Sequence, residues 1–154
     1  MKYIKPFIFE AKGDILDLAK LQTDVEIFRK RLEHDWDWND DKTCLKGHCG
    51  MVSEELEKFL QKLGYNVVRV RGYYLDAEDE FEPDTHNWEF NDIENYNKKW
   101  ERNGESAKGL KFPHWWIEVG SYIVDVTEDQ FHPSEADVYR IGIHKKPVSY
   151  YKKG

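Results

Sequence analysis

The sequence has few cysteines, no excess of positive charge and no long apolar run, and each of these absences excludes a class of protein. Two cysteines among 154 residues do not make a disulfide scaffold. The 23 Lys and Arg residues are outnumbered by 30 Asp and Glu residues, and a formal net charge of −7 gives no support to a phosphate-binding surface. We therefore expect no nucleic-acid partner.

Apolar segments are short throughout the chain. No run approaches the roughly 18 residues that a membrane-spanning helix needs. The start of the chain lacks a secretory apolar region, because Glu10, Lys12 and Asp14 interrupt it. We expect a cytoplasmic protein without a membrane partner.

Aromatic residues are plentiful, at 15% of the chain. Disordered chains are poor in aromatic residues, so this content favours a folded protein. A length of 154 residues is usual for one domain, and no repeat or flexible linker marks a boundary. We expect a single domain over residues 1–154.

Helical spacing dominates the first part of the chain. Apolar residues recur every three or four positions between Ile15 and Leu32, and Asp14 is a candidate N-cap. A second helix is predicted to begin close to Cys49 and to stop at Gly64. Its apolar stripe comprises Val52, Leu56, Phe59, Leu60 and Leu63.

Strand patterns begin after the second helix. Residues 67–74 are predicted to form a strand because they are rich in Val and Tyr. Residues 76–97 are acidic and irregular, with a short helix expected near residues 93–100, and residues 101–111 extend this polar loop.

The last third of the sequence predicts a β-hairpin. Apolar and polar residues alternate over residues 114–119 and 122–126, and Gly120-Ser121 between them fits a two-residue turn. A further strand is predicted over residues 137–143, and residues 150–154 are predicted to be a tail. Helices followed by a mostly antiparallel sheet indicate an α+β fold.

Cys49, in the run Gly47-His48-Cys49-Gly50, is a candidate nucleophile. It lies where irregular chain is expected to become helix, and the N–H groups at a helix start favour the thiolate. The same N–H groups can bind a developing oxyanion. The alternative is a small, inert residue at the beginning of a helix.

The hairpin predicts a contact between His114 and Asp125. A two-residue turn pairs Ile117 with Val124 and Trp116 with Asp125, which places His114 and Asp125 diagonally on one face. A carboxylate on one ring nitrogen leaves the other nitrogen free to act as a base. The alternative is a polar pair on a solvated sheet face.

At this point the sequence resembles the transglutaminase-like proteins of the papain-like cysteine hydrolase superfamily. The run from Cys49-Gly50-Met51-Val52-Ser53 to Val70-Arg71-Gly72 is similar to their nucleophile helix and first strand. The runs 114–119 and 123–127 are similar to their His strand and Asp strand, and Asp129-Gln130-Phe131 is similar to an extension in bacterial members. The resemblance spans more than half of the chain.

The resemblance implies a papain-like or transglutaminase-like core, with the nucleophile helix packed on an antiparallel sheet. It implies Cys49 as nucleophile, His114 as general base and acid, and Asp125 as the residue that orients His114. The implied chemistry is peptide or isopeptide hydrolysis, deamidation or acyl transfer through a thioester. The implied partner is a protein or peptide substrate, and no cofactor is expected.

One part of the family pattern is missing. Papain-type enzymes have a Gln a few residues before the Cys as an oxyanion donor, and residues 41–46 contain none. Gln130, His48 and a second backbone N–H are the remaining candidates. Trp115 and Trp116 point in opposite directions from a strand, so one of them is expected in the core. The other, together with Trp36 or Trp38, is expected to form a wall of the cleft beside His114.

Other interpretations of the sequence were weighed. Cys44, His48 and Cys49 do not have a usual zinc spacing, so we expect no metal site. The acidic residues between 76 and 84 are expected to be a solvated loop, and their alternative role is to steer a basic substrate. A non-catalytic protein-binding module on the same fold is the alternative function.

Overall fold

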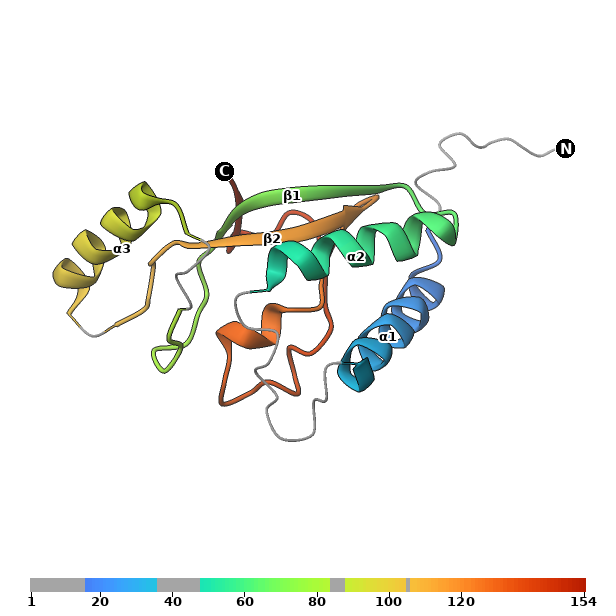
Figure 1. The fold of residues 1–154 in the computed structure, drawn as a ribbon, viewed down its shortest axis with the longest axis horizontal. Coiled ribbons are helices and arrows are strands. Elements are labelled where there is room, and N and C mark those ends of the chain that lie inside the picture. Colours follow the sequence, from blue (N-terminus) through green and yellow to red (C-terminus); the bar gives the residue numbers. More distant parts are fainter. Residues whose placement is uncertain (1–15, 36–47, 84–87, 105) are drawn as a thin grey trace, which may run out of the picture.

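The computed structural model describes residues 16–35, 48–83, 88–104 and 106–154. These residues form an α+β fold that combines helices with a curled, five-stranded antiparallel sheet (Figure 1). The strand order is β4 (Gly142–Lys145), β3 (Tyr122–Asp125), β2 (Phe112–Val119), β1 (Val67–Tyr74) and β5 (Tyr151–Lys153). The fold class predicted from the sequence is confirmed at this level.

Helices α1 (Leu18–Asp35) and α2 (Cys49–Lys62) agree with the two predicted helices. The carboxylate of Asp17 accepts the backbone N–H of Lys20 at 3.0 Å and so caps α1. The predicted cap, Asp14, lies outside the described residues. Helix α2 stops at Gly64, whose φ of +96° is a conformation that glycine adopts readily. None of the described helices is long and apolar enough to cross a membrane.

The hairpin of β2 (Phe112–Val119) and β3 (Tyr122–Asp125) has the predicted register. Ile117 pairs with Val124 and Val119 pairs with Tyr122. Gly120 in the turn has a φ of +58°, as a tight hairpin turn requires. Strand β1 (Val67–Tyr74) pairs with β2 along its whole length.

The two outer strands differ from the prediction. The strand predicted over residues 137–143 is wrong for most of its length, because residues 132–139 form successive turns closed by i to i+3 hydrogen bonds. Strand β4 (Gly142–Lys145) follows these turns and pairs with β3. The predicted tail is also wrong, because β5 (Tyr151–Lys153) pairs with β1.

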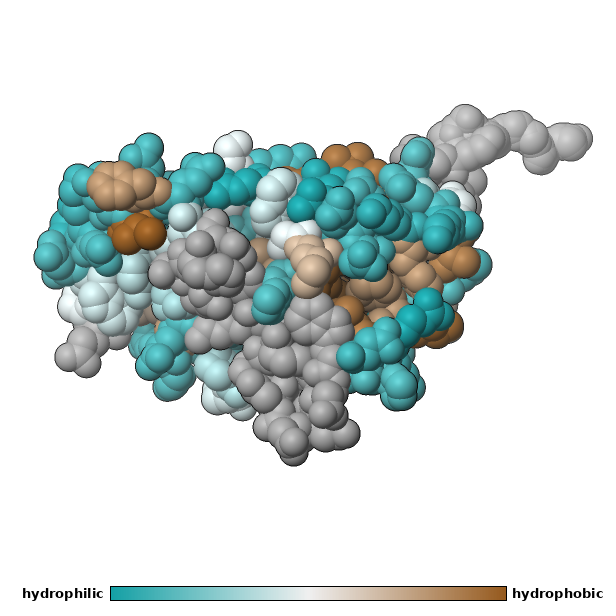
Figure 2. Space-filling model, in the orientation of Figure 1, coloured by the Kyte–Doolittle hydropathy of each residue, from teal (hydrophilic) through white to brown (hydrophobic). Residues whose placement is uncertain are grey.

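Helix α3 (Phe90–Asn103) is longer than the short helix predicted near residues 93–100. Glu89 and Asp92 form a capping box, which explains its early start. It lies at the end of β1 and β2 away from α1 (Figure 1). The surface over α3 is largely hydrophilic, whereas hydrophobic side chains gather over α1 and α2 (Figure 2).

Two apolar clusters cover the two faces of the sheet. Helices α1 and α2 pack on one face through the aliphatic residues Leu21, Val25, Val52, Leu56, Leu60, Ile117, Val119 and Val124. The other face is covered by aromatic residues, which include Tyr74, Phe112, Trp116, Phe131 and Tyr151. His114 and Asp125 belong to this second face, so a large aromatic cluster excludes water around them.

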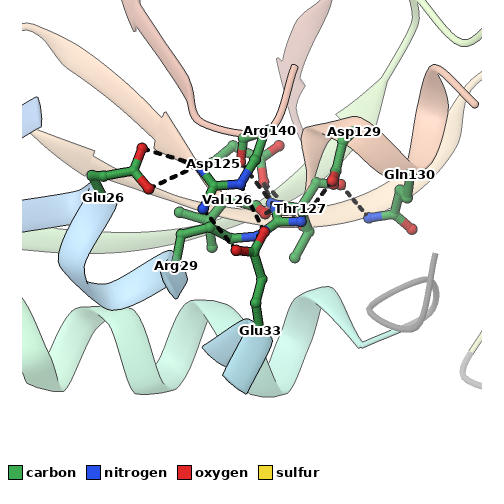
Figure 3. Close-up of polar contacts among 9 residues, drawn as sticks. All are labelled: Glu26, Arg29, Glu33, Asp125, Val126, Thr127, Asp129, Gln130 and Arg140. Atoms are coloured by element: carbon green, nitrogen blue, oxygen red, sulfur yellow. Dashed lines mark hydrogen bonds and ion pairs between the residues drawn. The ribbon is translucent and has the colours of Figure 1, made fainter. Parts of the chain in front are cut away.

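Arg29 of α1 fixes the chain that follows Asp125. Its fully buried guanidinium donates to the carbonyl groups of Val126 and Arg140, the latter at 2.9 Å (Figure 3). It also pairs with Asp129 at 2.8 Å, in the short 3-10 helix η2 (Glu128–Phe131). Helix α1 therefore holds both ends of the turn between β3 and η2.

Candidate active site

Cys49 occupies the first position of α2. Its thiol is free and half-buried, and it lies on the wall of a cavity of about 370 Å³. The first backbone N–H groups of a helix have no partners within the helix and carry a partial positive charge. The start of a 14-residue helix therefore points donors at the space beside the Cys49 thiol.

Arg69 of β1 ties the first turn of α2 to the sheet. Its guanidinium donates to the carbonyl of Gly50 at 2.8 Å and to the hydroxyl of Ser53 at 3.0 Å. The same guanidinium lies 3.9 Å from the ring centre of Trp115, a cation–π contact. These contacts place Cys49 beside β2.

His114 and Asp125 form the contact that the hairpin predicted. Nε2 of His114 lies 2.6 Å from Oδ2 of Asp125, and both side chains are almost completely buried. Oδ1 of Asp125 accepts the backbone N–H of Thr127 at 2.9 Å and its hydroxyl at 3.0 Å. The hydroxyl of Tyr151 donates to Oδ2 at 2.8 Å. The buried carboxylate is thus held by four donors.

The position of Tyr151 depends on a close approach between β5 and β1. Gly72 is the partner of His114 in the sheet, and a Cβ atom at residue 72 would lie 2.2 Å from the carbonyl oxygen of Lys152. Any side chain at this position would therefore displace β5 and with it the Tyr151 hydroxyl.

Nδ1 of His114 is the imidazole nitrogen that Asp125 does not bind. It is buried and has no hydrogen-bond partner of ordinary geometry among the described residues. Because Nε2 is bound to Asp125, Nδ1 is the nitrogen left to interact with the nearby Cys49 thiol, whose pKa the charge of His114 lowers. The structure therefore brings together the three residues that the sequence suggested, with His114 between Cys49 and Asp125.

The charges of Cys49, His114 and Asp125 shift one another's pKa values. Burial raises the pKa of the Cys49 thiol, but the nearby imidazolium, its hydrogen bond and a backbone hydrogen bond with Trp115 together bring this pKa below its ordinary value. Burial lowers the pKa of His114, but the charges of Asp125 and Cys49 raise it to about 10. Burial opposes the charged form of Asp125, but His114 and the donors around it lower its pKa. The arrangement favours a thiolate–imidazolium pair.

The two oxyanion candidates of the sequence both reach the cavity. His48 and Gln130 are among its lining residues. The side-chain N–H of Gln130 donates to the carbonyl of Thr127 at 2.9 Å, which fixes the amide in place. Trp115 lines the cavity, whereas Trp116 is 1% exposed and belongs to the aromatic cluster. The predicted division between the two tryptophans is confirmed, and Trp36 and Trp38 lie outside the described residues.

The cavity beside Cys49 is walled mainly by aromatic and other apolar side chains. Its described lining residues beyond those named above include Met51, Phe81, Pro83, Trp88, Phe112, Pro113 and Phe131. Arg71 is the permanently charged member of this set, and no carboxylate among the described residues lines the cavity. The walls therefore suit an apolar group, and the fixed charge suits an acidic one.

The acidic stretch has structural contacts of its own. The carboxylate of Glu78 accepts the backbone N–H of Ser134 at 3.1 Å, and that of Asp79 accepts the N–H of Ala107 at 2.7 Å. These bonds secure two loops against each other. Within the described ranges, no group of three or more His, Cys, Asp and Glu side chains is arranged to hold a metal ion. Cys44, the other thiol of that interpretation, lies outside these ranges.

Sequence reasoning missed Tyr151, Thr127 and Arg69. Nothing local to a Tyr-Tyr-Lys-Lys run indicates that a phenol reaches Asp125. Thr127 had a signal, because a Thr two residues after an Asp is a common way for that carboxylate to bind the chain that follows it. Nothing local to the predicted strand indicates that Arg69, rather than Arg71, reaches the first turn of α2.

Comparisons with known proteins identified no relative. No protein-family model, no curated protein and no solved structure matches this chain. The chemical interpretation therefore rests on the geometry of the described residues.

Proposed function

We propose that this protein is a cysteine hydrolase or acyltransferase with a papain-like, transglutaminase-like core. The observation that supports the proposal is the buried His114–Asp125 pair at 2.6 Å, which lies close enough to the Cys49 thiol for His114 and Cys49 to shift each other's pKa. A nucleophile, a base and an orienting carboxylate in contact are the parts that covalent acyl transfer needs. The fold does not select among peptide hydrolysis, deamidation and acyl transfer.

The proposed reaction begins with the Cys49 thiolate. Its sulfur attacks the carbonyl carbon of an amide, and the negative charge that develops on the oxygen is stabilised by N–H groups at the start of α2. Nδ1 of His114 gives its proton to the leaving amine as the C–N bond breaks, and a thioester remains on Cys49. Water or an amine then attacks the thioester, loses its proton to His114 and releases the acyl group.

Asp125 keeps His114 in the orientation that this cycle requires. The carboxylate accepts from Nε2, so Nδ1 remains directed at the thiol in both the neutral and the charged imidazole. Since the leaving amine needs the charged form, activity should fall as the pH rises through the His114 pKa of about 10.

A test that needs no natural substrate uses p-nitrophenyl acetate as acyl donor. The protein is quenched in acid, and the acetylated residue is located by mass spectrometry. We expect an acetyl group on Cys49 that forms rapidly and turns over in the wild type. In His114→Ala it should form more slowly and then persist, because this variant lacks both the group that activates the thiol and the base for deacylation. Cys44→Ala is the matched control and should behave as the wild type.

Two results would contradict the proposal. One is acetylation of Cys49 no faster than that of a free thiol. The other is p-nitrophenyl acetate hydrolysis that survives Cys49→Ala. Either outcome favours the alternative, a protein-binding module in which the thiol is not used.

A further inference from the structure

A second cavity lies beside the first, between α3 and the start of β2. It has a volume of about 280 Å³ and is lined by Tyr73, Asp92, Asn95, Tyr96, Lys99 and Lys111. It borders the Cys49 cavity at two points. Arg71 of the first cavity pairs with Asp92 of the second at 3.3 Å, and Tyr73 of the second is the sheet partner of Pro113 in the first.

The second cavity carries an excess of positive charge. Lys99 and Lys111 are both half-buried, and neither takes part in an ion pair with any described residue. Burial lowers the pKa of Lys99, and the nearby charges of Lys111, Arg102 and Lys152 lower it further. Like charges that are partly desolvated repel one another, so this cluster is unfavourable without an anion.

The acidic groups near this cavity do not cancel the charge. Asp92 is bound by Arg71 and also accepts the backbone N–H of Glu89 in the capping box of α3. Burial raises the pKa of Tyr96, and the nearby charge of Glu82 raises it further. Among the residues that line this cavity, Lys99 and Lys111 therefore keep a local excess of positive charge on a protein whose net charge is −7.

We propose that this cavity binds a carboxylate of an acidic peptide substrate that lies extended along the sheet from Cys49. The proposal rests on the proposed function and names its substrate class. The spacing suits an extended chain. Trp115, which hydrogen-bonds with Cys49, and Lys111 are four residues apart, or about 13 Å at the rise of a strand. An acidic side chain about four residues from the reacting amide would reach the two lysines.

The alternative expected from the acidic stretch was a basic substrate. Glu78 and Asp79 of that stretch are occupied by backbone N–H groups of neighbouring loops, and no described carboxylate lines the Cys49 cavity. Of the charged residues that line the two cavities between Cys49 and α3, Arg71 and Asp92 pair with each other, and Lys99 and Lys111 leave an excess of positive charge. They favour an acidic chain and disfavour a basic one.

Iodoacetyl pentapeptides test the proposal without a known substrate. In each probe the Cys49 sulfur displaces iodide and forms a C–S bond, and the labelling rate reports how well the peptide is held. Three C-terminally amidated probes carry Glu, Gln or Lys at the positions distant from the iodoacetyl group. A second set carries that group at the other end, so both chain directions are sampled.

We expect the Glu probe to label Cys49 about tenfold faster than the Gln probe at low ionic strength in one of the two sets. The Lys probe should be slower than both. The advantage of Glu should fall at about 1 M salt, because screening then acts over about 3 Å. Lys99→Gln with Lys111→Gln should remove most of the advantage. The matched double variant Lys30→Gln with Lys58→Gln removes the same charge from exposed positions on α1 and α2 and should keep it.

Equal rates for the Glu and Gln probes in both sets would overturn the proposal. Equal losses in the two double variants would also overturn it, because the effect would then be one of net charge. Labelling with iodoacetamide, which carries no peptide, distinguishes failure of this proposal from failure of the proposed function. If it labels Cys49 rapidly while the peptide probes show no preference, the acidic-substrate proposal fails and the activated thiol stands. If it labels Cys49 only as fast as a free thiol, the proposed function fails, and the Glu to Gln ratio still tests the cavity.

Discussion

Nε2 of His114 lies 2.6 Å from Oδ2 of Asp125, and the two residues come from neighbouring strands of one hairpin. A buried pair at this distance is held in one geometry, because breaking it would leave two polar groups without water. The other imidazole nitrogen is left without a hydrogen-bond partner among the described residues, and the charge of the nearby Cys49 raises the pKa of His114. In the proposed function, this relationship is what activates the thiol of Cys49.

Replacing Asp125 by Asn should reduce acyl transfer by about 10²–10⁴-fold. The amide keeps the shape of the side chain but no longer stabilises the imidazolium, so the pKa of His114 should fall and that of Cys49 should rise. Both shifts can be followed by NMR titration of His114 and by the pH dependence of Cys49 alkylation. Asp76→Asn, at an exposed position, is the control. An unchanged alkylation profile in Asp125→Asn would show that the carboxylate does not act through His114.

Tyr151→Phe should lower activity by about three- to tenfold and destabilise the fold by about 1–3 kcal/mol. The ring keeps its contacts with Tyr74 and Trp116, but Asp125 loses the hydroxyl that donates at 2.8 Å. Tyr150→Phe removes a hydroxyl that lies 3.5 Å from His144, outside the triad. If the two variants lose equal activity, the Tyr151 hydroxyl has no special role in holding Asp125.

Arg69→Met should slow the acylation of Cys49 more than it weakens peptide-probe binding. The guanidinium holds the carbonyl of Gly50 and the hydroxyl of Ser53, so its loss should loosen the first turn of α2. Arg69→Lys keeps the charge but cannot make both bonds, and it should restore only part of the rate. A pre-steady-state burst assay separates acylation from binding. Full activity in Arg69→Met would mean that the sheet contact does not position Cys49.

Arg29→Met should destabilise the protein by about 3–5 kcal/mol, because it leaves the buried carboxylate of Asp129 without its cation. The double variant Arg29→Met with Asp129→Asn should recover part of this loss. Urea denaturation measures both, and Lys30→Met on the exposed side of α1 is the control. Additive losses in the double variant would show that the two residues are not coupled.

The hairpin shows how much the sequence alone can establish. A Gly-Ser pair between two alternating runs determines the turn length, the turn length determines the register, and the register places His114 beside Asp125. Every step depends on residues within twelve positions of one another. The start of α2 at Cys49 was likewise predictable from local spacing and from Gly64.

The rest of the site depends on contacts that are distant in the sequence. Tyr151 reaches Asp125 because β5 crosses Gly72, and a three-residue strand is too short to show a period. The prediction of a strand over residues 137–143 was wrong because the chain before Gly142 forms turns. In this segment Arg140 donates to the carboxylates of Glu26 and Glu33 of α1 (Figure 3). The strand β4 then begins five residues later than predicted.

The central claim is that His114 activates Cys49, and site-resolved alkylation tests it most directly. Limiting iodoacetamide is applied to the wild type and to His114→Ala from pH about 5 to about 9, and Cys44 and Cys49 are quantified separately by mass spectrometry. We predict that Cys49 reacts selectively with an apparent pKa well below the ~8.5 of a free thiol, and that His114→Ala raises it towards that value. An apparent pKa of Cys49 at the free-thiol value, or one that does not change in His114→Ala, would contradict the account.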